Sequence, residues 1–186
     1  MELESIYNST RESMSKILDG LKRDFTTLRT GKVTTAVVDN IKVDYYGTQT
    51  PISQASSVVA VDATTITINP WDKSLLNAIQ KAIQEANIGV NPNTDGDTIK
   101  LFFPPMTTEQ RESEAKKAKG FGEKSKISIR NIRKESNDKI KKMLKNKEIT
   151  EDEEKKGLET IQKITDEFVG KVDKMVKDKE QDIKKI

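Results

Sequence analysis

The residues best suited to chemistry in this chain are cations that recur along one segment. Arg130, Arg133 and Lys134 lie in the run RNIRKESNDK. Residues 109–147 contain 14 Lys and Arg against 6 Asp and Glu, whereas residues 148–186 contain 9 against 12. A local surplus of one sign attracts an anion more strongly than the net charge of +3 for the whole chain suggests. The pattern therefore indicates a polyanionic partner, of which structured RNA is the commonest.

Two side chains that are common in catalytic and metal sites are missing. The chain has no cysteine, which excludes a disulfide, a thiolate nucleophile and a cysteine-based metal site. It has no histidine, which removes the usual general base near neutral pH and the commonest metal ligand. We therefore expect a non-enzymatic protein with no catalytic residue, no metal and no cofactor. An enzyme acting through carboxylates alone is the remaining catalytic alternative, but it lacks paired acidic residues in a plausible apolar pocket.

Long helices are expected to position the cations. Hydrophobic residues make up only 33% of the chain and charged residues 34%, as in helices that bury one stripe and solvate the rest. Apolar residues recur every three or four positions over 2–29. A capping box at Thr107 begins a second helix, and Thr150 caps a third. These segments predict an elongated antiparallel three-helix bundle.

A compositionally different segment separates the first two helices. Short β-rich runs predict strands, and an apolar stripe between the last two predicts a helix over 72–87. The expected strands are 41–46, 57–62, 65–69 and 98–103. The fold class is therefore α+β. We expect a bundle formed by 1–30 plus 106–186 and an inserted β/α/β domain at 31–105.

The two crossings between these domains are predicted to form a two-strand hinge. Thr30 and Gly31 follow the first helix, and glycine permits the backbone angles needed to leave it. Pro104 and Pro105 close the insert, because proline cannot donate to a strand ladder and restricts the residue before it.

A helical wheel places the cations on one face of the second helix. Lys126, Arg130, Arg133 and Lys134 fall within about 100° of one another at 100° per residue. The apolar stripe around Ile129 is adjacent but separate, so the basic stripe should be exposed. Arginine can hold a phosphate through two hydrogen bonds and lysine adds a point charge, which suits an RNA backbone better than a base-specific pocket.

The competing interpretation of this stripe is a solvated helix face. Such faces normally mix both signs, whereas this one is nearly all positive over about five turns. It also lacks aromatic side chains, which favours structured RNA over single strands. Two other features are interpreted as structural: Gly120-Phe121-Gly122 as a local helix irregularity and Trp71 as part of the small domain's core or rim. An exposed contact with a partner is the alternative for Trp71.

The sequence shows no feature of membrane insertion. The first ten residues, MELESIYNST, are polar, and no stretch approaches the roughly 20 apolar residues that a membrane span needs. We expect a cytoplasmic protein that does not contact a membrane.

Several segments together resemble the bacterial ribosome recycling factor family over essentially the whole chain. They are LRTGK at 28–32, VDYYGTQTPISQ at 43–54, INPWDKS at 68–74, GVNPNTDGDTIKLFFPPMTTEQR at 89–111 and RNIRKESNDKIKKMLKNKEITEDE at 130–153. The sequence departs from the usual family pattern at Lys32, where arginine is common, and at 33–35, where small residues and proline are frequent. The departures concern the hinge.

The resemblance implies an L-shaped monomer that binds the large ribosomal subunit after termination. With elongation factor G and its GTP hydrolysis, it would separate the subunits so that mRNA and tRNA leave. The resemblance implies that Arg130 and Arg133 contact rRNA. The helical wheel adds Lys126 and Lys134 as candidate contacts, and Arg29 near the bundle end is a further candidate. The competing class is a structural or chaperone-like helical protein whose insert grips a client protein, and salt-sensitive RNA binding separates the two.

Overall fold

The computed structural model describes residues 2–185, and the chain divides into two compact units. The bundle unit extends to Leu28 and resumes over Glu112–Lys184, and the sheet unit is Arg29–Arg111. The first expected boundary, between 30 and 31, lies close to this division. The second, between 105 and 106, precedes it, because the first turn of the second long helix groups with the sheet unit. The expected α+β fold class is confirmed.

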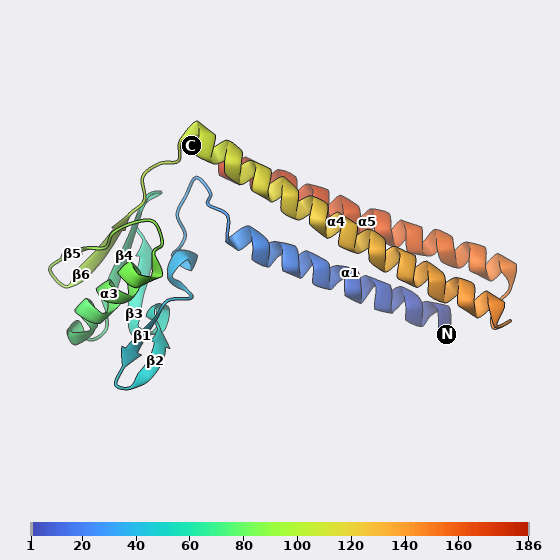
Figure 1. Ribbon diagram of the computed structural model, residues 1–186, viewed down its shortest axis with the longest axis horizontal. Coiled ribbons are helices and arrows are strands. Elements are labelled where there is room, and N and C mark those ends of the chain that lie inside the picture. Colours follow the sequence, from blue (N-terminus) through green and yellow to red (C-terminus); the bar gives the residue numbers. More distant parts are fainter. Residues whose placement is uncertain (1, 186) are drawn as a thin grey trace. The chain divides into compact units, whose positions relative to one another are not determined.

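Three long helices form the bundle unit, and α4 runs opposite to α1 and α5 (Figure 1). Their bounds are Glu2–Thr26 for α1, Thr108–Lys145 for α4 and Glu151–Lys184 for α5. Both expected capping boxes are confirmed. The Thr107 amide donates to the Gln110 side chain while the Gln110 amide donates to the Thr107 hydroxyl, and Thr150 and Glu153 exchange the same pair. Within the described chain, no helix combines the length and the apolar character that crossing a bilayer requires.

The first helix ends at Thr26, earlier than the expected Arg29. The Thr26 hydroxyl donates to the Arg23 carbonyl and the Thr27 hydroxyl to the Asp24 carbonyl, each at 2.6 Å. The backbone then tightens into bonds that span three residues, including the Leu28 amide to the Phe25 carbonyl. These bonds satisfy the terminal carbonyls without further helical turns.

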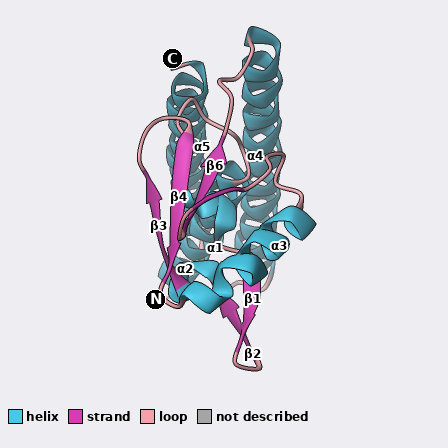
Figure 2. Ribbon diagram, turned by 90° about the vertical axis from the view of Figure 1, so that its left-hand side faces the viewer, coloured by secondary structure: helices cyan, strands magenta, loops and turns pink. Residues whose placement is uncertain are grey.

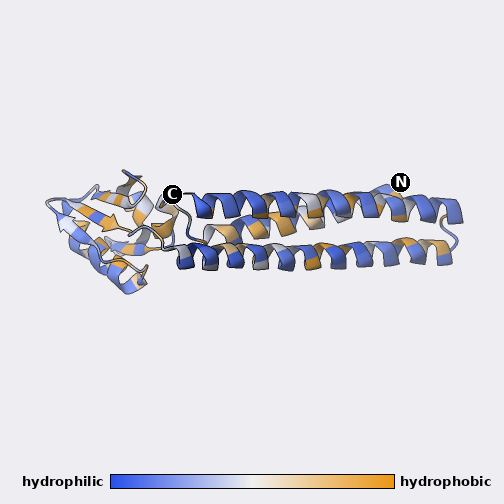
Figure 3. Cartoon of the chain, turned by 90° about the horizontal axis from the view of Figure 1, so that it is seen from above, coloured by the Kyte–Doolittle hydropathy of each residue, from blue (hydrophilic) through white to orange (hydrophobic). Residues whose placement is uncertain are grey.

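The bundle core consists of apolar stripes, and the outward turns of the long helices are hydrophilic (Figure 3). Met14, Ile129, Ile140, Ile161 and Val172 are all fully buried. One polar pair interrupts this core: the Thr10 and Ser136 hydroxyl oxygens lie 2.7 Å apart. A buried hydroxyl without a partner would be costly, so this pair favours one alignment of α1 against α4.

The glycines at 120 and 122 do not interrupt α4, so the expected local irregularity is wrong. Gly122 is buried, and a Cβ built on it would lie 2.4 Å from Val176 Cγ2 of α5. Gly120 is exposed, with open space where its Cβ would be. Gly122 therefore permits a close approach of two helices, whereas Gly120 has no packing role of this kind.

The sheet unit contains a four-stranded antiparallel sheet with the order β3-β4-β6-β5 and a separate β1–β2 hairpin (Figure 2). The four strands of the sheet are β3 Ser56–Ala60, β4 Thr65–Pro70, β5 Asn93–Asp95 and β6 Thr98–Phe102. The hairpin consists of β1 Lys42–Tyr45 and β2 Thr48–Pro51. The helical elements of the sheet unit are α2 Ile52–Ala55, α3 Leu76–Ala86 and short 3₁₀ turns at Thr35–Val38 and Lys73–Leu75.

One face of this sheet carries the core of the unit. Ile66, Ile68, Ile99 and Leu101 alternate with exposed or half-buried residues and are fully buried, together with Ile79 of α3. The expected helix end at Asn87 is confirmed, since this residue is left-handed with φ 48°. Trp71 was expected in the core or at the rim of the small domain; it is 70% exposed, which excludes the core. Its amide is tied to the Ala55 carbonyl while the indole extends into solvent.

Candidate nucleic-acid interface

The continuous α4 presents Arg130 and Lys134 to solvent one turn apart. Among the described residues, neither forms an ion pair, although Glu135 and Asp138 lie on the same helix. Two neighbouring cations without an acidic partner keep their full charge available to an external anion.

Arg133 lies at the border between α4 and α5 and is half-buried. Its Nη1 donates to Gln162 Oε1 of α5 at 3.2 Å, and Gln162 Nε2 donates in turn to Asp166 Oδ1 at 2.8 Å. This contact orients the guanidinium but uses only part of its donor set, because arginine has five N–H groups. We call Arg130, Arg133 and Lys134 the open basic cluster.

Lys126 differs from the expected exposed stripe. Its side chain is only 17% exposed, and its Nζ lies 2.8 Å from Glu123 Oε1 and 2.9 Å from Asp173 Oδ1 of α5. The hydrogen bonds that Lys126 donates to Glu123 and, second, to Asp173 raise its pKa, partly offset by burial. The ammonium is thus neutralised locally and joins two helices of the bundle.

The remaining cations divide along the length of α4. Toward its N-terminus, Lys117 pairs with Glu114 at 2.7 Å and Lys119 lies 3.7 Å from Glu180 of α5. Beyond Arg130, no lysine of α4 forms an ion pair within residues 2–185. The uncompensated positive charge is therefore concentrated in the C-terminal half of the helix.

Sequence reasoning did not identify the α5 residues that hold the border of this face. Gln162 contacts Arg133, and Asp173 contacts Lys126. The two cations are seven residues apart on α4, and their two partners are eleven residues apart on α5. Both intervals return to the same side of a helix. The sequence does place Gln162 and Asp173 on one side of the third helix. A wheel of a single helix does not show which residues of a neighbouring helix face that side.

Arg29 lies in the first linker, outside α4, and its Nη2 donates to the Pro104 carbonyl of the second linker. Thr30 donates its hydroxyl to the Lys32 carbonyl at 2.8 Å. Two backbone bonds attach the linkers to one turn of the sheet unit: the Val33 amide to Ala63 and the Phe103 amide to Thr64. The predicted hinge residues Thr30, Gly31, Pro104 and Pro105 all lie outside these two attachments.

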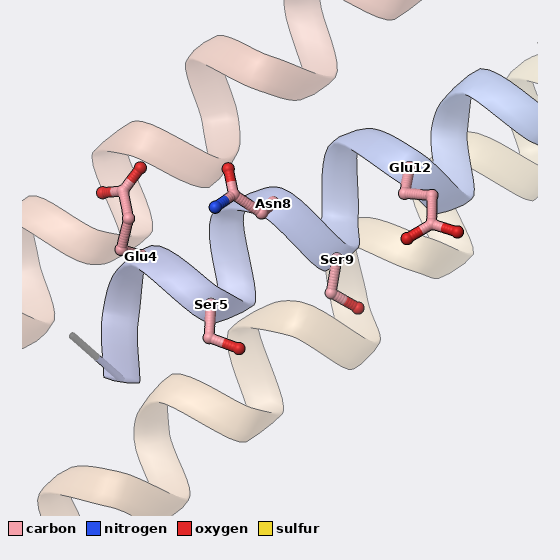
Figure 4. Close-up of a pocket in the computed structure, with 5 residues that line it drawn as sticks. All are labelled: Glu4, Ser5, Asn8, Ser9 and Glu12. Atoms are coloured by element: carbon pink, nitrogen blue, oxygen red, sulfur yellow. The ribbon is translucent and has the colours of Figure 1, made fainter.

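A shallow depression on α1 offers no competing anion site. It is lined by Glu4, Ser5, Asn8, Ser9 and Glu12, all from the same helix (Figure 4). The lining supplies two carboxylates and no cation, and the nearby Lys16 is already paired with Glu12 at 2.9 Å, so phosphate is not attracted. The described residues also contain no group of three or more acidic side chains arranged to hold a metal ion.

Comparison with known proteins agrees with this combination of bundle and insert. A family model described as ribosome recycling factor matches residues 21–183. The ribosome-recycling factor of Nitratiruptor sp. is 72% identical over the full length of both chains, and that of Wolinella succinogenes is 64% identical over the same span. A solution structure of the ribosome recycling factor has a TM-score of 0.79 at 34% identity, covering 98% of this chain and 97% of its own.

A second solved structure places a relative in a complex. It comprises models for the T. thermophilus ribosome recycling factor and the E. coli elongation factor G bound to the E. coli post-termination complex. It covers 98% of this chain and 99% of its own, with a TM-score of 0.65 at 40% identity. The matches define a non-enzymatic translation factor rather than a chaperone-like protein. The chain belongs to the ribosome recycling factor family.

Proposed function

We propose that this chain separates post-termination ribosomes into subunits together with elongation factor G and GTP, so that mRNA and tRNA are released. Its bundle docks on rRNA of the large subunit through the basic face of α4. Membership of the recycling factor family supports the task, and the complex of a relative with elongation factor G supports the partner. The protein acts as a monomer in the cytoplasm, where ribosomes work.

The open basic cluster carries the docking proposal. Arg130 and Lys134 are exposed, Arg133 is oriented by Gln162, and no carboxylate within residues 2–185 pairs with any of the three. Phosphate contacts of this kind release counterions, so the affinity should fall steeply with salt. Lys126 supports the face indirectly, because its bonds fix α4 against α5.

The linkers carry the mechanical part of the proposal. Backbone bonds at Val33 and Phe103 tie each linker to the sheet unit, and Thr107 begins the capping box of α4. Bending would therefore concentrate in 29–32 and 104–106, where Gly31 and the two prolines lie. The Arg29 contact with the Pro104 carbonyl joins the two linkers, so it would have to adjust when the GTPase displaces the sheet unit. Arg29 stays a proposed rRNA contact.

Light scattering of purified post-termination ribosomes tests the proposal. The protein, elongation factor G and GTP are mixed with ribosomes, and each component is omitted in turn. A fall in scattering that requires all three supports subunit separation. An unchanged signal with a matched elongation factor, despite salt-sensitive binding to large subunits, would contradict it.

A further inference from the structure

Ile127 is an exposed apolar residue at the edge of the basic face of α4, between Lys124 and Arg130 along the helix. It is 55% exposed, and within residues 2–185 it is the one large hydrophobic side chain of the bundle unit with this exposure; the others lie in the sheet unit. Residues three and four positions away on a helix are surface neighbours. For Ile127 these are Lys124, Arg130, Asn131 and Glu123, all of them exposed, and the Glu123 carboxylate is already paired with Lys126.

We propose that Ile127 is an apolar contact of the RNA-docking surface, packing against sugar and base edges of structured RNA while the surrounding cations hold phosphates. This inference rests on the proposed function. Lone exposed hydrophobic residues are common and carry no meaning by themselves. Here the cations on both sides determine what approaches the isoleucine, because the same surface that accepts the side chain must also accept positive charge.

The chemistry of both partners fits. The minor groove of an RNA helix is wide and shallow and exposes riboses, and loops expose base edges, so a short aliphatic side chain can reach apolar atoms that phosphates do not shield. A β-branched side chain in a helix has one strongly preferred χ1 rotamer. Ile127 therefore loses little conformational freedom when it is covered. The cluster gives a salt-dependent part of the affinity, and Ile127 adds a part that salt does not screen.

Binding to purified large subunits over a salt series tests this directly. Ile127→Ala should fold normally, since alanine is the best helix former and the position is exposed. We expect it to weaken binding about tenfold at every salt concentration, with the salt slope unchanged. Ile127→Leu should bind like the parent, because it retains the apolar volume. Parental affinity for Ile127→Ala at all salt concentrations would overturn the proposal.

Cross-linking identifies what covers the side chain. The chain contains no cysteine, so Ile127→Cys provides a single attachment point for a maleimide-linked benzophenone. Ser15→Cys, at an exposed position of α1, is the matched control. Cross-links from position 127 to rRNA, beyond those from position 15, are expected. Cross-links to ribosomal protein alone, or no excess over the control, would overturn the proposal.

A double variant separates failure of this inference from failure of the proposed function. If Arg130→Ala/Lys134→Ala flattens the salt slope and Ile127→Ala has no effect, the face docks on RNA but Ile127 does not contribute. If neither variant changes binding, α4 does not dock on RNA and both proposals fail.

Discussion

Lys126 of α4 donates to Asp173 of α5, with Nζ 2.9 Å from Oδ1, while Arg130 one turn further along forms no ion pair within residues 2–185. Two cations four residues apart on one helix thus have different surroundings. The first holds helices together and the second is open to an external anion. The basic face is therefore part structural and part available for docking.

Replacing Lys126 should affect stability more than docking. Lys126→Ala removes the bonds to Glu123 and Asp173, and we expect a loss of about 1 kcal/mol in the free energy of unfolding. The salt slope for large-subunit binding should change little, because the ammonium is already neutralised. Urea unfolding and salt-series binding on the same preparation measure both. If the variant keeps the parental stability but its slope of log affinity against log salt falls by about 1, Lys126 is itself a phosphate contact.

Gly122 and Gly120 should respond to alanine in opposite directions. At Gly122 the added methyl group meets Val176, whose β-branched side chain has little freedom to move, so we expect a loss of about 1 kcal/mol. At exposed Gly120 the space is open, and alanine should stabilise the helix by about 0.5–1 kcal/mol. Thermal unfolding of both variants checks this. Equal stabilisation by the two substitutions would mean that α5 is not packed against Gly122.

Helix periodicity and capping patterns predicted most of this fold, because they are local. The starts of α4 and α5 follow from Thr107 and Thr150, whose capping boxes need only three further residues. Strand β5 and the α1 end at Thr26 were not predicted: β5 is short and polar, and the end depends on threonine hydroxyls that also suit a helix interior. The face of α4 was predicted, but the covering of Lys126 depends on Asp173, distant in sequence.

Stiffening the first linker should separate binding from subunit splitting. Gly31 lies between the end of α1 and the attachment of Val33 to Ala63, and its amide donates no backbone hydrogen bond among the described residues. Gly31→Pro therefore removes no bond, but it restricts both its own backbone and that of Thr30. We expect parental affinity for large subunits and little or no fall in light scattering with elongation factor G and GTP. Normal splitting by this variant would rule out bending at Gly31 as part of the mechanism.

The start of α5 should weaken in acid through Glu153. The Thr150 amide donates to this carboxylate and holds its pKa below the usual value. A lowered folded-state pKa contributes stability above the unfolded-state pKa, which is lost as the pH falls through the folded value. Glu153→Gln lacks this titration while keeping an acceptor. Its stability deficit at neutral pH should shrink once the pH drops below about 4.3. Urea unfolding across pH measures the deficit, and a constant deficit would contradict the assignment.

The most direct test of the account is the salt dependence of large-subunit binding by variants of the open basic cluster. Arg130→Ala/Lys134→Ala should weaken binding and lower the slope of log affinity against log salt by about 2, and Arg133→Ala should lower it by about 1. Lys22→Ala, at an exposed position of α1, is the matched control and should keep the parental slope. If both variants keep the parental affinity and the parental salt slope, the protein does not dock through α4.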